Sequence, residues 1–246
     1  MANWQDPQTT GVNAATVGVP RAARDVGLRS YMLSVYNYMA SGVLLTGIVA
    51  LLFAPFAADV LVRADGRGMS ALGWIVMLSP LGIVIAMSYG ANRMRTSTLQ
   101  MLFWAFATLM GLSMSTLFLA FTGVSIAQTF FATAAAFLGL SLYGYTTKRD
   151  LSVFGTFLIM GVVGILVAML INMFLQSSAM ALAISAIGVL LFAGLTAYDT
   201  QRIKSMYLYV QGTEMAGKTV ILGALTLYLD FINMFQFLLS FMGDRR

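Results

Sequence analysis

Residues 183–204 read AISAIGVLLFAGLTAYDTQRIK, and residues 224–239 read ALTLYLDFINMFQFLL. Both stretches are apolar enough to lie in a lipid bilayer as helices, because a hydrocarbon core about 30 Å thick takes roughly 20 apolar residues. Each stretch nevertheless contains one carboxylate, Asp199 in the first and Asp230 in the second. The two stretches indicate a helical membrane protein, and the two aspartates are its least expected side chains.

The composition agrees with a membrane protein. Of 246 residues, 59% are hydrophobic and 9% are charged, and the mean hydropathy is +0.85. Soluble domains carry about 25% charged residues, so most of this chain must lie in lipid. Cysteine and histidine are both absent, which excludes disulfides, thiol and imidazole catalysis and the usual zinc ligands. We expect no cofactor.

Further apolar segments of the same kind fill the chain. We predict seven transmembrane helices, at residues 31–54, 71–91, 98–122, 126–146, 151–175, 180–203 and 220–242. Short connections join them, so residues 31–246 are expected to form a single all-α integral membrane domain. Residues 1–30 are polar and lack the apolar core of a signal peptide, and they are predicted to form a flexible arm.

The lysines and arginines are unevenly divided between alternate connections, which predicts the orientation by the positive-inside rule. With the N-terminus in the cytoplasm, that side holds Arg21, Arg24, Arg29, Arg93, Arg95, Lys148, Arg149, Arg202, Lys204 and Lys218, and the other side holds Arg63, Arg67, Arg245 and Arg246. The net charge of +5 is therefore explained by topology, and nucleic-acid binding is not expected. We expect a periplasmic C-terminus. A re-entrant seventh segment, which carries Asp230, Asn233 and Gln236, would instead return the C-terminus to the cytoplasm.

Asp230 lies in the middle of the seventh segment, where an ionised carboxylate costs about 3 kcal/mol on insertion scales. Such a side chain should face the bundle interior and find a partner. Thr226, Asp230 and Asn233 are spaced i, i+4, i+7 and form one polar stripe on an apolar helix. Asp230 is thus the strongest candidate for a functional residue. The alternative is a protonated aspartate that only holds helices together.

Asp199 is more ambiguous on its own. It lies near the end of the sixth segment, with Thr196 one turn before it and Arg202 one turn after it. It could be an interfacial residue paired with Arg202, worth about half a kcal/mol. The sixth and seventh segments, however, are joined by a short loop and are expected to pack as a hairpin, which brings Asp199 and Asp230 to one cavity. Two close carboxylates cannot both ionise cheaply and share a proton, so the pair could act as a pH switch in a chain without histidine.

The same residues resemble a known family. LLFAGLTAYDTQRIKSMY and LYLDFINMFQFLLSFMG are similar to the signature of the Bax inhibitor-1 family, the transmembrane Bax inhibitor motif proteins. LRSYMLSVYNYMASGVLLTGIVA and SLYGYTTKRDLSVFGTFLIMG resemble its bacterial members. The resemblance extends from Leu28 to Gly243, and it implies the bacterial inner membrane as the location.

The resemblance also implies a fold and a site. It implies a seven-helix bundle whose seventh helix is central, and a hydrogen-bonded pair of membrane aspartates, Asp199 and Asp230, that senses pH on a calcium-permeable leak path. An arginine of the second helix would latch one carboxylate in the closed state, and Arg93 and Arg95 are the candidates. Ordinary anchoring at the membrane surface is the alternative role for either arginine.

Two carboxylates are too few for a tight calcium cage of six to eight oxygen ligands. Calcium is therefore expected to bind Asp199 and Asp230 weakly and transiently, which suits a leak rather than a pump. No Gly-rich phosphate loop is present to suggest ATP as a driving force.

Two other functions remain open on the sequence. The first is a non-conducting regulator of a membrane-bound AAA protease or another stress-response partner, with the basic polar arm as its docking element. The second is an intramembrane aspartyl protease, which also uses one aspartate on each of two adjacent helices. The second is disfavoured because LYL precedes Asp230, where such proteases have Gly-x-Gly, and because no Pro-Ala-Leu motif is present. We therefore do not expect an enzyme.

Overall fold

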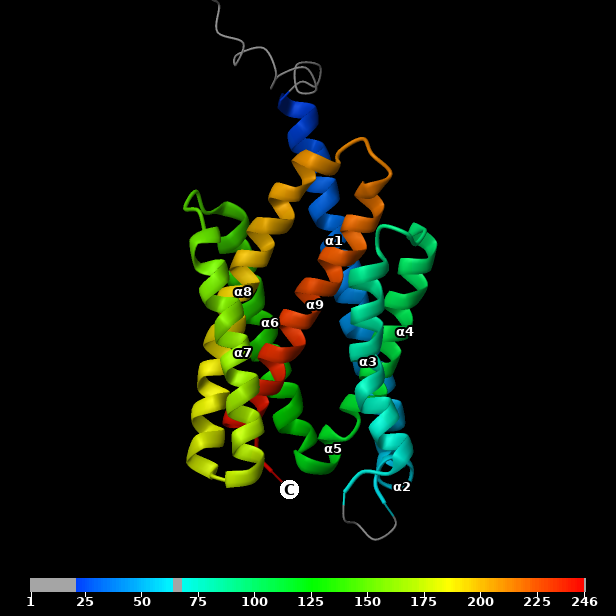
Figure 1. Ribbon diagram of the computed structural model, residues 1–246, viewed down its shortest axis with the longest axis vertical. Coiled ribbons are helices and arrows are strands. Elements are labelled where there is room, and N and C mark those ends of the chain that lie inside the picture. The colour runs from blue at the N-terminus through cyan, green and yellow to red at the C-terminus, as the bar shows by residue number, and fades with distance from the viewer. Residues whose placement is uncertain (1–20, 64–67, 246) are drawn as a thin grey trace, which may run out of the picture.

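The computed structural model describes residues 21–63 and 68–245, and within them the fold is a bundle of helices (Figure 1). The elements are α1 (Arg21–Phe53), η2 (Ala54–Phe56), α2 (Ala57–Leu61), α3 (Ala71–Gly90), α4 (Thr96–Met114), α5 (Leu117–Ala120), α6 (Gly123–Thr146), α7 (Ser152–Leu175), α8 (Ser178–Val210) and α9 (Met215–Met242). Seven helical spans in these ranges are long and apolar enough to cross a membrane, if α1 is counted with α2 and α4 with α5. The predicted all-α membrane class with seven transmembrane helices is confirmed.

Several helices are longer than the apolar segments that predicted them. α1 begins at Arg21, inside the predicted arm and before the predicted start at residue 31. α8 continues to Val210, past the predicted end at residue 203, and α9 begins at Met215, before residue 220. Hydropathy marks the depth of the hydrocarbon, whereas a helix continues into water as long as its backbone hydrogen bonds persist. The rest of the predicted arm, residues 1–20, lies outside the described residues.

Local sequence accounts for several helix starts. Ser70, Thr122 and Ser177 precede α3, α6 and α8, and each side-chain oxygen accepts a hydrogen bond from the backbone N–H three residues on, at 3.0, 3.3 and 3.3 Å. An N-cap of this kind satisfies one of the N–H groups that a helix leaves without a partner in its first turn. All three caps lie at the end of the bundle where the chain finishes (Figure 1).

The two ends of the bundle differ in charge. α1 begins at one end, where the α3–α4, α6–α7 and α8–α9 turns also lie, and the chain finishes at the other (Figure 1). We call the first the basic end, because it carries the lysines and arginines that the positive-inside count assigns to the cytoplasm, and the second the C-terminal end. Which side of the membrane each end faces stays a prediction.

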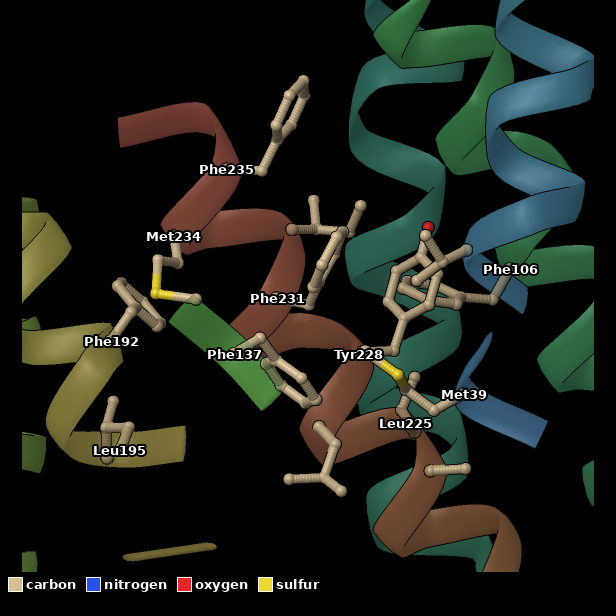
Figure 2. Packing of buried hydrophobic residues seen from close by; sticks show 14 of the residues in the cluster. Met39, Phe106, Phe137, Phe192, Leu195, Leu225, Tyr228, Phe231, Met234 and Phe235 are labelled. Carbon is tan, nitrogen blue, oxygen red and sulfur yellow. The ribbon is translucent and has the colours of Figure 1, made fainter. Parts of the chain in front are cut away.

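α9 is the central helix of the bundle. Of its apolar stretch, 61% is buried, against 6–39% in the other spans. It packs along α8 and against α1, α4 and α6, whereas α3 rests mainly on α4 and α7 on α8. Figure 2 shows how its aromatic side chains fill the core: the Tyr228 ring lies 5.0 Å from that of Phe106, and the Phe231 ring 5.6 Å from that of Phe137. The predicted central position of the seventh helix is therefore confirmed.

Candidate functional site

α8 and α9 bring the two membrane aspartates together. The helices form an antiparallel hairpin closed by the turn at residues 211–214, and they pack against each other along their length. The side chain of Asp199 on α8 is 7% exposed and that of Asp230 on α9 is 4% exposed. The two carboxyl groups lie within hydrogen-bonding reach of each other. The hairpin packing predicted this proximity, but the two side chains do not line one cavity as expected.

A hydrogen bond between two carboxyl groups requires that one of them carries a proton. The Oδ2 atom of Asp230 is buried, and no N–H or O–H group of the described residues reaches it. Leaving a buried polar atom without a partner is costly. A proton shared between Asp199 and Asp230 removes both this cost and the repulsion of two adjacent negative charges. The arrangement favours the singly protonated pair.

Asp199 faces a cavity of about 290 Å³ between α3, α8 and α9, toward the basic end. Ser88 of α3 and Thr219 and Thr226 of α9 line the same cavity, so its wall is partly polar. Asp230 is not among the lining residues. The pair therefore has an outer carboxyl, Asp199, and an inner one, Asp230. Sequence patterns did not indicate Ser88, because only the tertiary fold brings α3 to this place.

Arg202 is the arginine that shares this cavity with Asp199. It lies one turn further along α8, on the same face as Asp199. Arg93 and Arg95, the two candidates for a latch, are exposed at the α3–α4 turn and do not line the cavity. The latch on Arg93 or Arg95 stays a prediction. In this structure Arg202, which lines the cavity together with Asp199, is better placed to act as a latch.

The polar residues expected to support the pair bond to their own helices. The Thr226 and Thr196 hydroxyls donate to the carbonyls one turn earlier, at 3.1 and 2.8 Å, and Asn233 Nδ2 donates to Leu229 O at 2.8 Å. Thr226 and Asn233 nevertheless line two different cavities. Thr226 lines the cavity at Asp199, whereas Asn233 lines a larger cavity of about 590 Å³ between α7, α8 and α9 toward the C-terminal end. Asp230 lies between these two residues along α9.

The polar stripe of α9 continues beyond the predicted residues. Gln236 and Ser240 line the 590 Å³ cavity and also a second cavity of about 520 Å³ at the C-terminal end. Both side chains are exposed, on a helix that is otherwise the most buried of the bundle. Gln236 was noted as a polar residue of the seventh segment, and extending the Thr226–Asp230–Asn233 pattern by two turns along the helical period would have found Ser240 as well.

Two glycines allow α6 and α7 to approach α8 closely just before Asp199. A Cβ atom at Gly144 of α6 would lie 2.2 Å from the backbone oxygen of Ala197, and one at Gly155 of α7 would lie 2.6 Å from the ring of Tyr198. At Gly144 the contact is with backbone atoms, so a larger residue would require a shift of a helix, whereas at Gly155 it is with the Tyr198 side chain. α6 and α7 thereby fix the position of α8 next to its carboxylate.

Hydrogen bonds add to the contact between α6 and α8. The Ser141 and Thr200 hydroxyls lie 3.0 Å apart, and Ser141 is also hydrogen-bonded to the Tyr36 hydroxyl of α1. One turn further, Lys204 Nζ donates to the carbonyl oxygen of Tyr145 at 2.7 Å. A lysine at the C-terminus of a helix satisfies carbonyl groups and complements the helix dipole. These bonds tie α8, close to Asp199, to α6, which packs against α9 as well.

A second lysine ties α3 to α9. Lys218 Nζ donates to the carbonyl oxygens of Ala91 and Asn92, at 3.1 and 3.4 Å, just past the end of α3. This end of α3 carries Ser88, so Lys218 fixes the wall of the Asp199 cavity that α3 supplies.

The described residues contain no group of three or more acidic side chains that could hold a metal ion. Asp199 and Asp230 offer at most four carboxylate oxygens, fewer than a tight calcium site takes. A cation that passes here would be held briefly.

Comparisons with known proteins show the family of the chain. The sequence profile of the family described as "Inhibitor of apoptosis-promoting Bax1" matches residues 28–246. The protein RP147 of Rickettsia prowazekii is 47% identical over 222 residues, which cover 90% of this chain and 92% of that protein. The inner membrane protein YbhL of Escherichia coli is 45% identical over 229 residues, 92% of this chain and 95% of the relative. A match over nearly the whole length of both chains leaves one conclusion: the chain is a bacterial member of the Bax inhibitor-1 family.

Proposed function

We propose that this protein is a pH-sensitive cation leak, with calcium as a permeant ion, and that the Asp199–Asp230 pair is its gate. The observation that carries the proposal is the adjacent carboxyl pair of α8 and the central helix α9, between a cavity toward the basic end and a cavity toward the C-terminal end. Buried ionisable groups in a membrane bundle are expensive, and they commonly mark ion or proton paths.

The gate works through one proton. With one carboxyl protonated, the hydrogen bond holds α8 to α9 and only one negative charge is buried. When that proton leaves, two unit charges repel each other by about 4 kcal/mol, at 4 Å and an effective dielectric constant near 20. This energy is large enough to redistribute two conformations that differ by a few kcal/mol. The same two charges attract a cation, so flux is expected to rise with pH.

A basic group beside Asp199 would favour closure through a charge-assisted hydrogen bond. Arg202 is placed for this role in the present conformation, and Arg93 or Arg95 would need a movement of α3 to reach it. The bacterial inner membrane, with the basic end in the cytoplasm, is the location that we propose. The name of the Escherichia coli relative and the distribution of lysine and arginine support it.

Calcium flux into liposomes that contain the purified protein tests the proposal, from pH 6 to 8. We expect flux that rises with pH in the wild type. Asp230→Asn should give low flux without pH dependence, because an amide donates a hydrogen bond to Asp199 at every pH. Asp59→Asn removes an exposed carboxylate at the C-terminal end and should change nothing. An unchanged pH profile in Asp230→Asn would exclude the pair as the gate, and no flux from folded wild-type protein would exclude the leak.

A non-conducting regulator of a membrane-bound AAA protease is the second candidate. It is favoured by the length of α8, which ends in Leu208 and Tyr209 with side chains 53% and 85% exposed at the basic end. Replacing both by serine should abolish copurification with the protease under this function and leave calcium flux unchanged under the first.

An intramembrane aspartyl protease is a weaker candidate. It would cleave a transmembrane substrate, and Asp230→Asn would abolish the cleavage.

A further inference from the structure

The C-terminal end of the bundle contains two cavities that share two side chains of α9. Their volumes are about 590 and 520 Å³, and Gln236 and Ser240 line both. Exposed amide and hydroxyl groups on a membrane helix avoid hydrocarbon and are satisfied by water. The two cavities are therefore expected to be wet, and α9 is accessible to water from this end.

One ionisable side chain lines these cavities. Within the described part of the chain, Arg245 is the single ionisable residue among those that line the two cavities. The aspartate pair lies deeper along α9, beyond Asn233. The charged side chain on the wall of the 520 Å³ cavity is therefore an arginine, although the leak proposed above would carry cations.

Arg245 is held in place by the backbone around it. The Asp244 N–H donates to Ser125 Oγ at 2.9 Å, and the Thr122 N–H donates to the Asp244 carbonyl oxygen at 3.1 Å. Arg245 itself forms an isolated β-bridge with Phe121, and its guanidinium carbon lies 5.9 Å from the centre of the Phe121 ring. Both hydrogen bonds use backbone groups of residue 244, so a change of the Arg245 side chain leaves them intact and removes only its contact with the Phe121 ring.

We propose that Arg245 is a specificity-determining residue whose positive charge sets the potential of the C-terminal cavities and disfavours cations there. Coulomb's law in water gives about a two-fold change in local ion concentration per unit charge at about 8 Å. This distance is within the Debye length of about 10 Å at 0.1 M salt. The effect on flux rests on the proposed leak, whereas the effect on the cavity potential does not.

The potential can be measured without any ion flux, because the chain contains no cysteine. Ser240→Cys places one thiol in the cavities, and its rates of reaction with sulfonatoethyl and trimethylammonioethyl methanethiosulfonate are compared. The ratio of the anionic to the cationic rate cancels any change in the thiol itself. We expect Arg245→Gln to lower this ratio about four-fold at low salt, the square of the factor per unit charge, since the two reagents differ by two unit charges. Arg245→Lys keeps the charge and should keep the ratio.

Arg63→Gln is the matched control, because Arg63 is exposed at the same end and lines neither cavity. It should leave the ratio unchanged. An unchanged ratio in Arg245→Gln would overturn the proposal. So would a thiol at position 240 that reacts with neither reagent in folded protein, since the cavities would then be closed to water.

Flux supplies the second test, because the effect of a potential depends on the valence of the ion. Arg245→Gln should raise potassium flux about two-fold and calcium flux about four-fold, the square of the monovalent factor. An equal change for both ions would mean that Arg245 acts through structure rather than charge, and would overturn the proposal. Wild-type protein without flux would refute the proposed leak alone, and the reagent ratio would still decide the role of Arg245.

Discussion

Gly144→Ala tests the close approach of α6 to α8 beside the carboxyl pair. The added Cβ would lie 2.2 Å from the backbone oxygen of Ala197, and such contacts are essentially never shorter than 3.0 Å. The two helices must therefore separate by about 0.8 Å at this point. Because Ala197 precedes Asp199 by two residues, the shift reaches the carboxylate almost undiminished.

The size of the shift decides two effects. Overpacking of this kind costs about 1–3 kcal/mol. An O–H···O hydrogen bond keeps its strength only over about half an ångström, from 2.5 to 3.0 Å, so a shift of this size weakens the carboxyl pair as well. Gly144→Ala is thus expected to be less stable than the wild type and, under the proposed leak, to conduct more at low pH.

Gly139→Ala is the matched control, since Gly139 lies on the same helix and a Cβ there would meet nothing within 4 Å. Both variants gain the same helix propensity from alanine, about 0.5–1 kcal/mol, so their difference isolates the contact. Equilibrium unfolding in mixed micelles should place Gly144→Ala about 1–3 kcal/mol below Gly139→Ala. Equal free energies of unfolding for the two variants would refute the reasoning.

Three more variants test contacts described above. Thr46→Val leaves the fully buried Tyr228 hydroxyl without its 2.6 Å partner, so a loss of about 1–3 kcal/mol in free energy of unfolding is expected and Thr46→Ser should restore it. Lys218→Met should speed amide exchange at the last turn of α3, and Lys218→Arg should do so less. Hydrogen bonds from the Ser152 hydroxyl and backbone N–H hold the pKa of Asp150 below its usual 3.8, so the start of α7 is stabilised above that pH and should fray in amide exchange as pH falls below it, whereas Asp150→Asn should lose this pH dependence.

Much of the fold followed from hydropathy, because lipid imposes one length and one kind of backbone structure on each span. The central place of α9 was implied by family resemblance, and its polar stripe agrees with it. Helix ends were less predictable: α8 continues for eight residues after Arg202, to Val210. Hydropathy does not distinguish a helix in water from a turn.

The site was predictable only in part. Asp199 and Asp230 stood out because each is a carboxylate in an apolar run. Ser88 gave no signal, since its approach depends on how α3 leans on the bundle, and the role of Gly144 depends on a backbone oxygen of another helix. Arg245 looked like an ordinary terminal arginine, because its place is set by hydrogen bonds to residues more than a hundred positions away. Such contacts leave no local pattern.

The length of α8 has a practical consequence. Its 33 residues extend about 50 Å at 1.5 Å per residue, well beyond a hydrocarbon core of about 30 Å. The turn at residues 211–214 is thereby carried into water on the two helices that hold the carboxyl pair. A spin label at the exposed Thr213, or a rigid fusion protein inserted at this turn as a fiducial for electron microscopy, would move with the hairpin. The opening of a gate in the bilayer could then be followed from a position that lipid does not cover.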